Sequence, residues 1–230
     1  MKYKLCILAA GIGKRMLPLT KDINKALLPV NFKAAITHII DKFPKDNEII
    51  IAVNYQELKI KEYISCAHPE RNIKYVFVDN VKGKGSGPGY SLLCCEKDLQ
   101  IPFILTAVDT LIKEEYPLPN NNWIGVDNVE DSREYCAVEI CNDDRKIKKI
   151  KDKSLESTKK VFIGLAGIKD YQLFFSGLHN DKNEIDNELQ LSNGLKSLIS
   201  SGIDSKQFSW TDIGKLKSYK DANKKFSNSE

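Results

Sequence analysis

Apolar runs and helical patterns alternate along the first half of the chain, and this alternation restricts the fold more than any other feature. Helical patterns are predicted over residues 34–43, 56–64 and 90–97, and a short apolar run follows each of them. Such alternation is typical of βαβ units around a mostly parallel sheet, whose ligands bind outside the carboxyl ends of the strands. The predicted strands are Tyr3 to Leu8, Glu48 to Val53, Ile73 to Val78 and Pro102 to Ala107.

After Asp109 the apolar runs become shorter and are separated by polar turns. This change indicates an antiparallel extension of the first sheet rather than a second domain. We therefore expect a single domain over residues 1–230. The strands predicted in this part cover residues 123–126, 135–140, 147–151, 161–168 and 207–210, and the helices cover residues 171–178, 188–199 and 216–226.

The charge and the amino terminus limit the partners that the chain can have. A net charge of +4, from 35 basic and 31 acidic residues, gives little support to a nucleic-acid partner. The apolar run from Leu5 to Ala10 is too short for a signal peptide or a membrane span, so we predict a cytoplasmic protein without a membrane partner. The six cysteines show no CxxC spacing and the three histidines are isolated, so neither a zinc site nor a catalytic histidine is expected.

A glycine-rich loop follows the first predicted strand directly. Gly11 and Gly13 would let backbone N–H groups approach phosphate oxygens, and Lys14 and Arg15 add positive charge beside them. The loop lacks the third glycine of a dinucleotide fingerprint and the lysine-serine end of a P-loop. By itself it is equally well explained as an anion-binding loop or as an ordinary tight turn between strand and helix.

The longer stretch from Leu8 to Val30, LAAGIGKRMLPLTKDINKALLPV, resembles the signature of the sugar-nucleotide pyrophosphorylase or nucleotidyltransferase family. The resemblance implies a Rossmann-like three-layer α/β sandwich, with a mostly parallel central sheet and an antiparallel extension on the acceptor side. It divides the domain into a nucleotide-binding half, residues 1–112, and an acceptor-binding half, residues 113–230. The matching positions are Leu8, Ala9, Ala10, Gly11, Gly13, Arg15, Pro18, Thr20, Lys25, Leu27, Pro29 and Val30.

Later segments resemble the other landmarks of this family in the same order. Thr106 to Thr110 is similar to the segment that carries a metal-binding aspartate, here Asp109, and Trp210 to Gly214 (WTDIG) is similar to the segment with a second one, Asp212. Tyr135 to Glu139 resembles the sugar-facing strand. Further matches are Asp152-Lys153 with a Glu-Lys pair, FIGLAGI (residues 162–168) with the strand that closes the acceptor pocket, and LQLSNGL (residues 189–195) with a Leu-Thr-Asp-Ala-Leu helix.

The resemblance implies an enzyme that joins a nucleoside monophosphate from an NTP to a phosphorylated acceptor and releases pyrophosphate. Mg²⁺ is the expected cofactor, because carboxylate oxygens such as those of Asp109 and Asp212 suit this hard cation. Positioning and charge neutralisation carry this kind of reaction. The residues expected to do so are Arg15, Lys25 and Lys153 for catalysis, Leu8, Ala9, Ala10, Gly11, Gly13, Lys14, Gly87 and Tyr90 for the nucleotide, and Cys136, Glu139 and Gly167 for the acceptor.

The chain departs from the family pattern mainly on the acceptor side. Cys136 replaces a glycine, Asn24 replaces the proline before the signature lysine, and residues 31–35 replace a Gly-Lys-Pro turn. The segment from Gly85 to Leu92 replaces the usual base-binding segment, and its Tyr-Ser-Leu end is similar to that of phosphocholine cytidylyltransferases. The expected acceptor is a sugar 1-phosphate, with a small phosphorylated alcohol such as phosphocholine as the alternative.

Several properties remain open from the sequence. The expected NTP is CTP, UTP or dTTP, and a homo-oligomer is compatible with the sequence. No acyltransferase or β-helix repeat follows, which disfavours the long bifunctional members of the family. A nucleotide-binding regulatory protein without activity is a further alternative, which the retained Arg15, Lys25, Asp109 and Asp212 disfavour.

Overall fold

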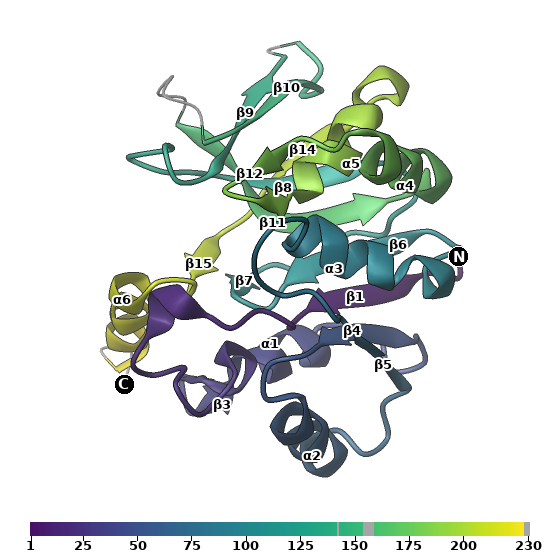
Figure 1. Cartoon of the computed structure of the whole chain (residues 1–230). Helices are drawn as coiled ribbons and strands as arrows, with labels where there is room; N and C mark the ends of the chain where they lie inside the picture. Colours follow the sequence, from purple (N-terminus) through teal and green to yellow (C-terminus); the bar gives the residue numbers. More distant parts are fainter. Residues whose placement is uncertain (142, 154–158, 228–230) are drawn as a thin grey trace.

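The computed structural model describes residues 1–141, 143–153 and 159–227. In this part of the chain, nine strands form one sheet (Figure 1). Seven of them follow the order β10-β9-β11-β6-β1-β4-β5, while β8 pairs with β11 and β14 pairs with β8. The strands β1, β4, β5 and β6 run parallel, whereas β8 to β11 pair antiparallel. The bounds are β1 (Lys4–Leu8), β4 (Ile49–Val53), β5 (Ile73–Phe77), β6 (Phe103–Ala107), β8 (Trp123–Asn128), β9 (Cys136–Ile140), β10 (Ile147–Asp152), β11 (Lys160–Ile168) and β14 (Asp204–Gln207).

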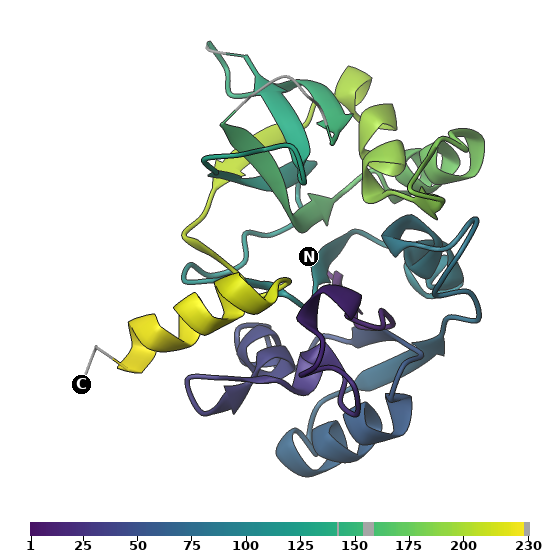
Figure 2. The same ribbon diagram turned by 60° about the vertical axis from the view of Figure 1, so that its left-hand side comes forward.

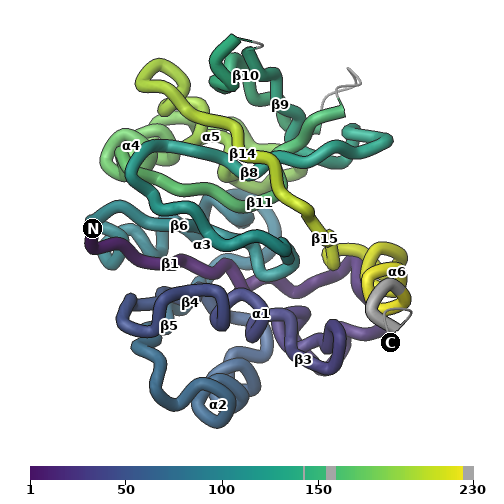
Figure 3. The backbone as a smooth tube through the Cα atoms, turned by 180° about the vertical axis from the view of Figure 1, so that it is seen from behind, coloured from purple at the N-terminus to yellow at the C-terminus, as the bar shows by residue number. Residues whose placement is uncertain are grey.

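Helices cover both faces of this sheet. The alternation of β1 shows why, because Leu5 and Ile7 point into one buried cluster while Cys6 and Leu8 point into the other. The first cluster contains side chains of α1 (Ala35–Asp41) and α2 (Glu57–Ala67). The second contains side chains of α3 (Pro88–Cys94), α4 (Tyr171–Asn180) and α5 (Leu191–Ser197). The result is the predicted three-layer α/β sandwich with an antiparallel extension (Figures 1 and 3).

The order of the strands determines where a ligand would lie. From β1 the chain passes to β4 and β5 on one side, and it then returns to β6 on the other side of β1. The strand order thus reverses between β1 and β6, and ligands of open α/β sheets bind in the crevice outside the carboxyl ends at such a point. The glycine loop follows β1, and Asp109 follows β6 after one residue, so both lie at this crevice.

Smaller elements complete the fold around this point. The carboxyl-terminal helix α6 (Leu216–Ser227) lies beside the amino-terminal segments (Figure 2), and its Tyr219 and Asn223 donate hydrogen bonds to the carbonyl oxygen of Pro29. Short strand pairs are β2 (Pro29–Val30) with β3 (Lys33–Ala34), β7 (Thr110–Ile112) with β15 (Trp210–Asp212), and β12 (Glu184–Ile185) with β13 (Glu188–Leu189). The 3-10 helices are η1 (Lys14–Met16), η2 (Lys25–Leu27), η3 (Glu96–Asp98) and η4 (Ile199–Ser201).

The predicted elements differ from the structure mainly in the last third of the chain. The predicted helix over residues 188–199 is wrong at its start, because Glu188 and Leu189 form β13 and the Leu189 N–H donates to the Ser86 carbonyl oxygen (2.7 Å). The predicted strand over residues 207–210 is wrong as well. Here the chain leaves the sheet at Gln207, and β15 then starts at Trp210. The predicted helix over residues 90–97 starts at Pro88 and ends at Cys94.

Among the described residues, no helix combines the length and the apolar character that a bilayer crossing requires.

Candidate active site

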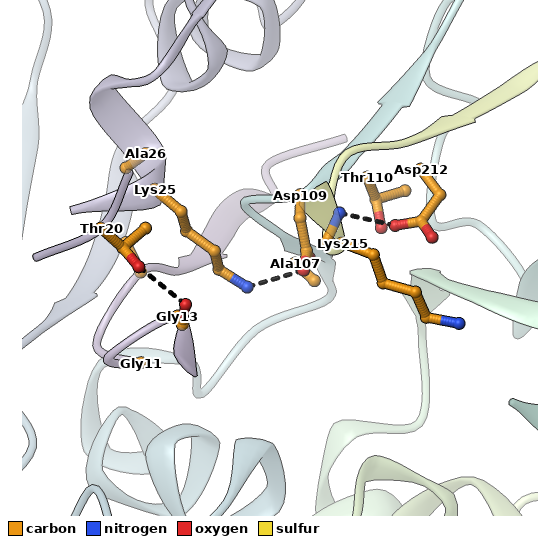
Figure 4. A network of polar contacts seen from close by, with 12 residues as sticks. Gly11, Gly13, Thr20, Lys25, Ala26, Ala107, Asp109, Thr110, Asp212 and Lys215 are labelled. Carbon is orange, nitrogen blue, oxygen red and sulfur yellow. Dashed lines mark hydrogen bonds and ion pairs between the residues drawn. The ribbon is translucent and has the colours of Figure 1, made fainter. Parts of the chain in front are cut away.

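The glycine loop has open space at Gly11 and a left-handed backbone at Gly13. A methyl group added to Gly11 would meet no atom within 4 Å, so this part of the loop faces open space. Gly13 has a left-handed backbone (φ 71°), which favours glycine, and its carbonyl oxygen accepts a hydrogen bond from the Thr20 hydroxyl (2.8 Å; Figure 4). Lys14 and Arg15 follow in η1 and are both exposed. The loop can therefore present backbone N–H groups and two cations to an anion.

The three residues before Gly11 anchor the loop in the core. Leu8 and Ala10 are buried in the cluster under α3, and Ala9 is buried in the cluster under α1. The Ala9 N–H donates to the Ala52 carbonyl oxygen (3.0 Å), which continues the pairing of β1 with β4. Their side chains face the core, so any contact with a ligand would come from their backbone.

Lys25 and Asp109 form an ion pair at the centre of the crevice. The Lys25 Nζ lies 2.6 Å from Asp109 Oδ2, and the two side chains are only 18% and 15% exposed (Figure 4). Burial raises the pKa of the Asp109 carboxyl, but the charge and hydrogen bond of Lys25, with a contribution from Arg15, outweigh it and lower that pKa. Asp109 is therefore a carboxylate at neutral pH, and two of the predicted basic residues, Lys25 and Arg15, lower its pKa.

Asp212 lies beside Asp109 because β15 pairs with β7. Asp212 is opposite Thr110 in this antiparallel pair, and the Ile213 N–H donates to the Asp109 carbonyl oxygen (3.1 Å). A methyl group added to Gly214 would lie 2.8 Å from Asp109 Oδ2 and 3.0 Å from Asp212 Oδ1, so both carboxylates approach one point (Figure 4). The two aspartates predicted as metal ligands thus converge.

This pair of carboxylates suits a magnesium ion. Mg²⁺ in nucleotide sites is commonly bound by one or two carboxylates, with waters and substrate phosphates as its other ligands. In the described part of the chain, no group of three or more His, Cys, Asp or Glu side chains could hold a metal ion. Asp109 and Asp212 would therefore hold the ion together with oxygens of the substrate.

Tyr135 and Lys215 border this site, although neither was predicted as a site residue. The Tyr135 hydroxyl donates to Asp212 Oδ2 (3.1 Å), and burial together with Asp212 raises the pKa of this phenol, which keeps the proton in place. Lys215 lies over the Tyr135 ring (4.7 Å to its centre) and pairs with Glu134 (2.5 Å). In the sequence, only their positions could have indicated that they lie near the site. Tyr135 is the first residue of one segment that resembles a family landmark, and Lys215 directly follows another.

Comparison with known proteins agrees with this geometry. Residues 4–229 match the model of the nucleotidyl transferase family. The chain belongs to this family. It is 27% identical over 215 residues to the bifunctional protein GlmU of Methanococcus maripaludis (90% of this chain, 50% of the relative). It is also 33% identical over 116 residues to choline-phosphate cytidylyltransferase of Streptococcus pneumoniae (49% of this chain, 48% of the relative).

Solved structures share the fold of this nucleotidyl transferase family member. A UDP-glucose pyrophosphorylase complexed with UDP-glucose superposes with a TM-score of 0.81 at 20% identity, covering 100% of both chains. Similarity at this identity shows the fold alone. The chain spans about half the length of the curated relatives it matches.

In the half of the chain predicted to bind the acceptor, Cys136 lies beside Asp152. Burial and the neighbouring Asp152 carboxylate raise the pKa of the Cys136 thiol well above its usual value. Asp152 also accepts a hydrogen bond from the Ser192 hydroxyl and lies 3.6 Å from the Lys196 Nζ. Asp152 and Ser192 belong to segments that resemble family landmarks, so the structure brings these two segments together.

Lys153, which was predicted for catalysis, and Glu139, which was predicted for the acceptor, contact residues outside the Lys25–Asp109 pair. Lys153 pairs with Asp186 at the surface, and its backbone N–H donates to the Tyr135 carbonyl oxygen (3.0 Å). Glu139 is exposed on β9 opposite Lys149 of β10. The structure shows no contact of Lys153 or Glu139 with Asp109, so their roles remain predictions.

Gly167 has a packing role in the structure. It is buried in β11, and a methyl group there would lie 2.2 Å from the Trp123 Nε1, so the indole takes the space that we expected for an acceptor. The glycine of this strand next to the site is Gly164, which has a left-handed backbone (φ 81°) and lies against Ala107 and Thr110. Gly164 stands in the same FIGLAGI segment, but the sequence does not show which of its glycines faces the site.

Gly87 and Tyr90 lie at the start of α3. A methyl group at Gly87 would lie 2.7 Å from the Leu189 carbonyl oxygen, so this glycine allows close packing against β13. The Tyr90 hydroxyl donates to Asp79 Oδ1 (2.7 Å), which raises the pKa of Tyr90 to about 12. These contacts do not test a nucleotide role for Gly87 and Tyr90, which remains a prediction.

Proposed function

We propose that this chain is a nucleotidyltransferase that joins the nucleoside monophosphate of an NTP to a sugar 1-phosphate and releases pyrophosphate. The observation that carries the proposal is the convergence of Lys25, Asp109 and Asp212 beside the glycine loop, at the point where the strand order reverses. A purely structural role would not require a lysine and two carboxylates at one opening of the sheet. Family membership supports the reaction class.

Each residue of the site has a role in this proposal. The glycine loop binds the triphosphate through backbone N–H groups, and Arg15 neutralises the leaving pyrophosphate. Lys25 binds the phosphates between which the new bond forms, and Lys153 contacts the acceptor phosphate. Asp109 and Asp212 would hold Mg²⁺, which would supply charge stabilisation to the reacting phosphates. The attacking phosphate oxygen is already ionised at neutral pH, so no side chain has to act as a base.

Two relatives bear on the identity of the acceptor. Similarity to GlmU over 90% of this chain, together with the resemblance of Tyr135 to Glu139 to the sugar-facing strand of the family, favours a sugar 1-phosphate. The higher identity to choline-phosphate cytidylyltransferase, over 49% of this chain, favours CTP with a small phosphorylated alcohol as the second candidate. Cys136 stands where the family pattern has glycine, and its larger side chain would leave less room for an acceptor bound there, which suits the smaller candidate.

A pyrophosphate-release assay tests these candidates. The purified chain is incubated with Mg²⁺, each of CTP, UTP, dTTP, ATP and GTP, and either glucose 1-phosphate, N-acetylglucosamine 1-phosphate or phosphocholine. Release that depends on a sugar 1-phosphate supports the proposal, and release with CTP and phosphocholine alone supports the second candidate. Nucleotide binding without release for any acceptor would contradict both and favour a regulatory protein.

A further inference from the structure

Asn24 is a fully buried side chain next to the lysine of the candidate site. Its Nδ2 donates to the carbonyl oxygens of Ala9 (2.9 Å) and Tyr55 (2.8 Å). Its Oδ1 accepts from the Ala26 N–H (2.9 Å). An amide side chain has two N–H donors and one acceptor oxygen, so every polar atom of Asn24 has a partner.

These hydrogen bonds join the two parts of the site that must act together. Ala9 lies where β1 ends and the glycine loop begins, and the Asn24 Nδ2 also lies 3.5 Å from the Gly11 carbonyl oxygen. Ala26 belongs to the 3-10 helix η2, which begins with Lys25, and the Asn24 side chain caps that helix. One side chain therefore sets the position of Lys25 relative to the glycine loop.

Tyr55 extends the same connection to the rest of the loop. Its N–H donates to the Ala10 carbonyl oxygen (3.4 Å), and its hydroxyl donates to the Thr20 carbonyl oxygen (2.9 Å) and to that of Lys21. The segment from Ala10 to Asn24 is thus hydrogen-bonded near both ends to Tyr55, the second residue after β4. We call the hydrogen bonds of Asn24 and Tyr55 described above the Asn24 clasp.

We propose that Asn24 is a positioning residue for nucleotidyl transfer, which holds Lys25 at the distance from the glycine loop that the reacting phosphates require. The inference rests on the proposed function. The resembling signature has proline at this position, and the Asn24 backbone (φ −69°) has the value that proline adopts. Asparagine therefore keeps the same backbone shape and adds hydrogen bonds that proline lacks.

Three substitutions at Asn24 separate its hydrogen bonds from its backbone shape. Asn24→Ala removes the clasp at this residue, Asn24→Pro removes it but keeps the φ angle, and Asn24→Asp keeps the acceptor for Ala26 but loses both donors. We expect kcat to fall roughly 100-fold in the Ala and Pro variants, with a smaller change in KM for the NTP, because a displacement of about 1 Å has this effect on positioned groups. The Asp variant should also lose most of kcat.

Asn47→Ala is the matched control. The Asn47 amide also donates to a backbone carbonyl oxygen, that of Tyr3 (2.8 Å), and Tyr3 precedes β1 at the end opposite the glycine loop. This control should lose a similar hydrogen bond and keep kcat within roughly twofold of the unchanged protein. If Asn24→Ala behaves like Asn47→Ala, or if Asn24→Pro keeps full kcat, the positioning role is refuted.

Hydrogen exchange measured by mass spectrometry tests the clasp without turnover. In Asn24→Ala we expect roughly tenfold faster exchange in peptides that cover residues 9–13 and 25–28, and unchanged exchange in the peptide that covers β6. Unchanged exchange in the first two peptides refutes the inference. If the unchanged protein shows no turnover with any substrate, that result counts against the proposed function alone, and the exchange rates still decide whether Asn24 holds the loop.

Discussion

Replacing Lys25 with methionine should make the stability of the protein depend on pH in a direction that the structure fixes. Methionine keeps most of the apolar stem but leaves the Asp109 carboxylate without its partner at 2.6 Å. Breaking a fully buried ion pair costs about 3–5 kcal/mol and an exposed one below about 1 kcal/mol. Because the two side chains are 18% and 15% exposed, we expect a loss of about 2 kcal/mol in the free energy of unfolding at neutral pH.

The sign of the pH dependence follows from the causes that act on Asp109. In the unchanged protein the folded-state pKa of Asp109 is lowered, so its stabilising contribution is present above about pH 4 and is lost as the pH falls further. Without Lys25 the burial of Asp109 raises its folded-state pKa above the unfolded value. The folded variant then binds a proton more readily than the unfolded chain, so its deficit is largest at neutral pH and shrinks as the pH falls toward about 5.

Urea unfolding of both proteins at about pH 7 and about pH 5 measures this difference. Lys33→Met is the control, because Lys33 pairs with Asp41 at 2.8 Å with side chains 46% and 44% exposed, and its loss should stay below about 0.5 kcal/mol. Adding Asp109→Asn to the Lys25 variant should remove the pH dependence of the deficit. A deficit no larger than that of the control, or one that is equal at both pH values, would refute this account of the site.

Three further substitutions test separate parts of the site. Gly214→Ala should lower turnover roughly 10- to 100-fold, because the added methyl group would lie 2.8 Å from Asp109 Oδ2 and displace this carboxylate. The free energy of unfolding, measured in urea, should change by less than about 1 kcal/mol because the end of the Asp109 side chain can move. Tyr135→Phe should raise the Mg²⁺ concentration needed for half-maximal turnover several-fold, because Asp212 loses a donor at 3.1 Å, and a titration of activity against Mg²⁺ measures it. Gly164→Ala should reduce the free energy of unfolding by about 1–2 kcal/mol, because φ is 81° and a threonine hydroxyl lies 3.1 Å from the added methyl group; urea unfolding without substrate measures this loss.

The parts of the fold and site that the sequence predicted are those set by local pattern. The strands β1, β4, β5 and β6 are mainly apolar and alternate with helical patterns, so their positions and parallel arrangement could be predicted from periodicity. Asp109 could be placed at the carboxyl edge because it follows such a run. Lys25 could be predicted as a site residue because the segment from Leu8 to Val30 resembles a family signature. Its ion pair with Asp109, 84 positions further along the chain, could be seen only in the structure.

The remaining parts depend on contacts between distant segments. The Asn24 amide reaches Tyr55 over 31 positions, and the Tyr135 hydroxyl reaches Asp212 over 77, and no periodicity indicates either contact. The predicted helix over residues 188–199 was wrong at its start, because a backbone contact of Leu189 with Ser86 competes with helical propensity there. Gly167 was predicted to contact the acceptor because its segment resembles a family landmark, but packing between segments places it against the Trp123 indole.

The Lys25–Asp109 pair connects stability with the proposed reaction. Lys25 holds the Asp109 oxygen that faces Gly214 and Asp212, which is the side from which both carboxylates could share one cation. Bound phosphates would attract the same ammonium group. The Asp109 carboxylate and the substrate phosphates would therefore compete for Lys25 when substrate is bound. A lysine on a flexible stem can change partners in this way, whereas a planar guanidinium would be held more firmly by the carboxylate. Lys25→Arg should therefore preserve the stability of the free protein better than it preserves turnover, which separates the two roles of this position.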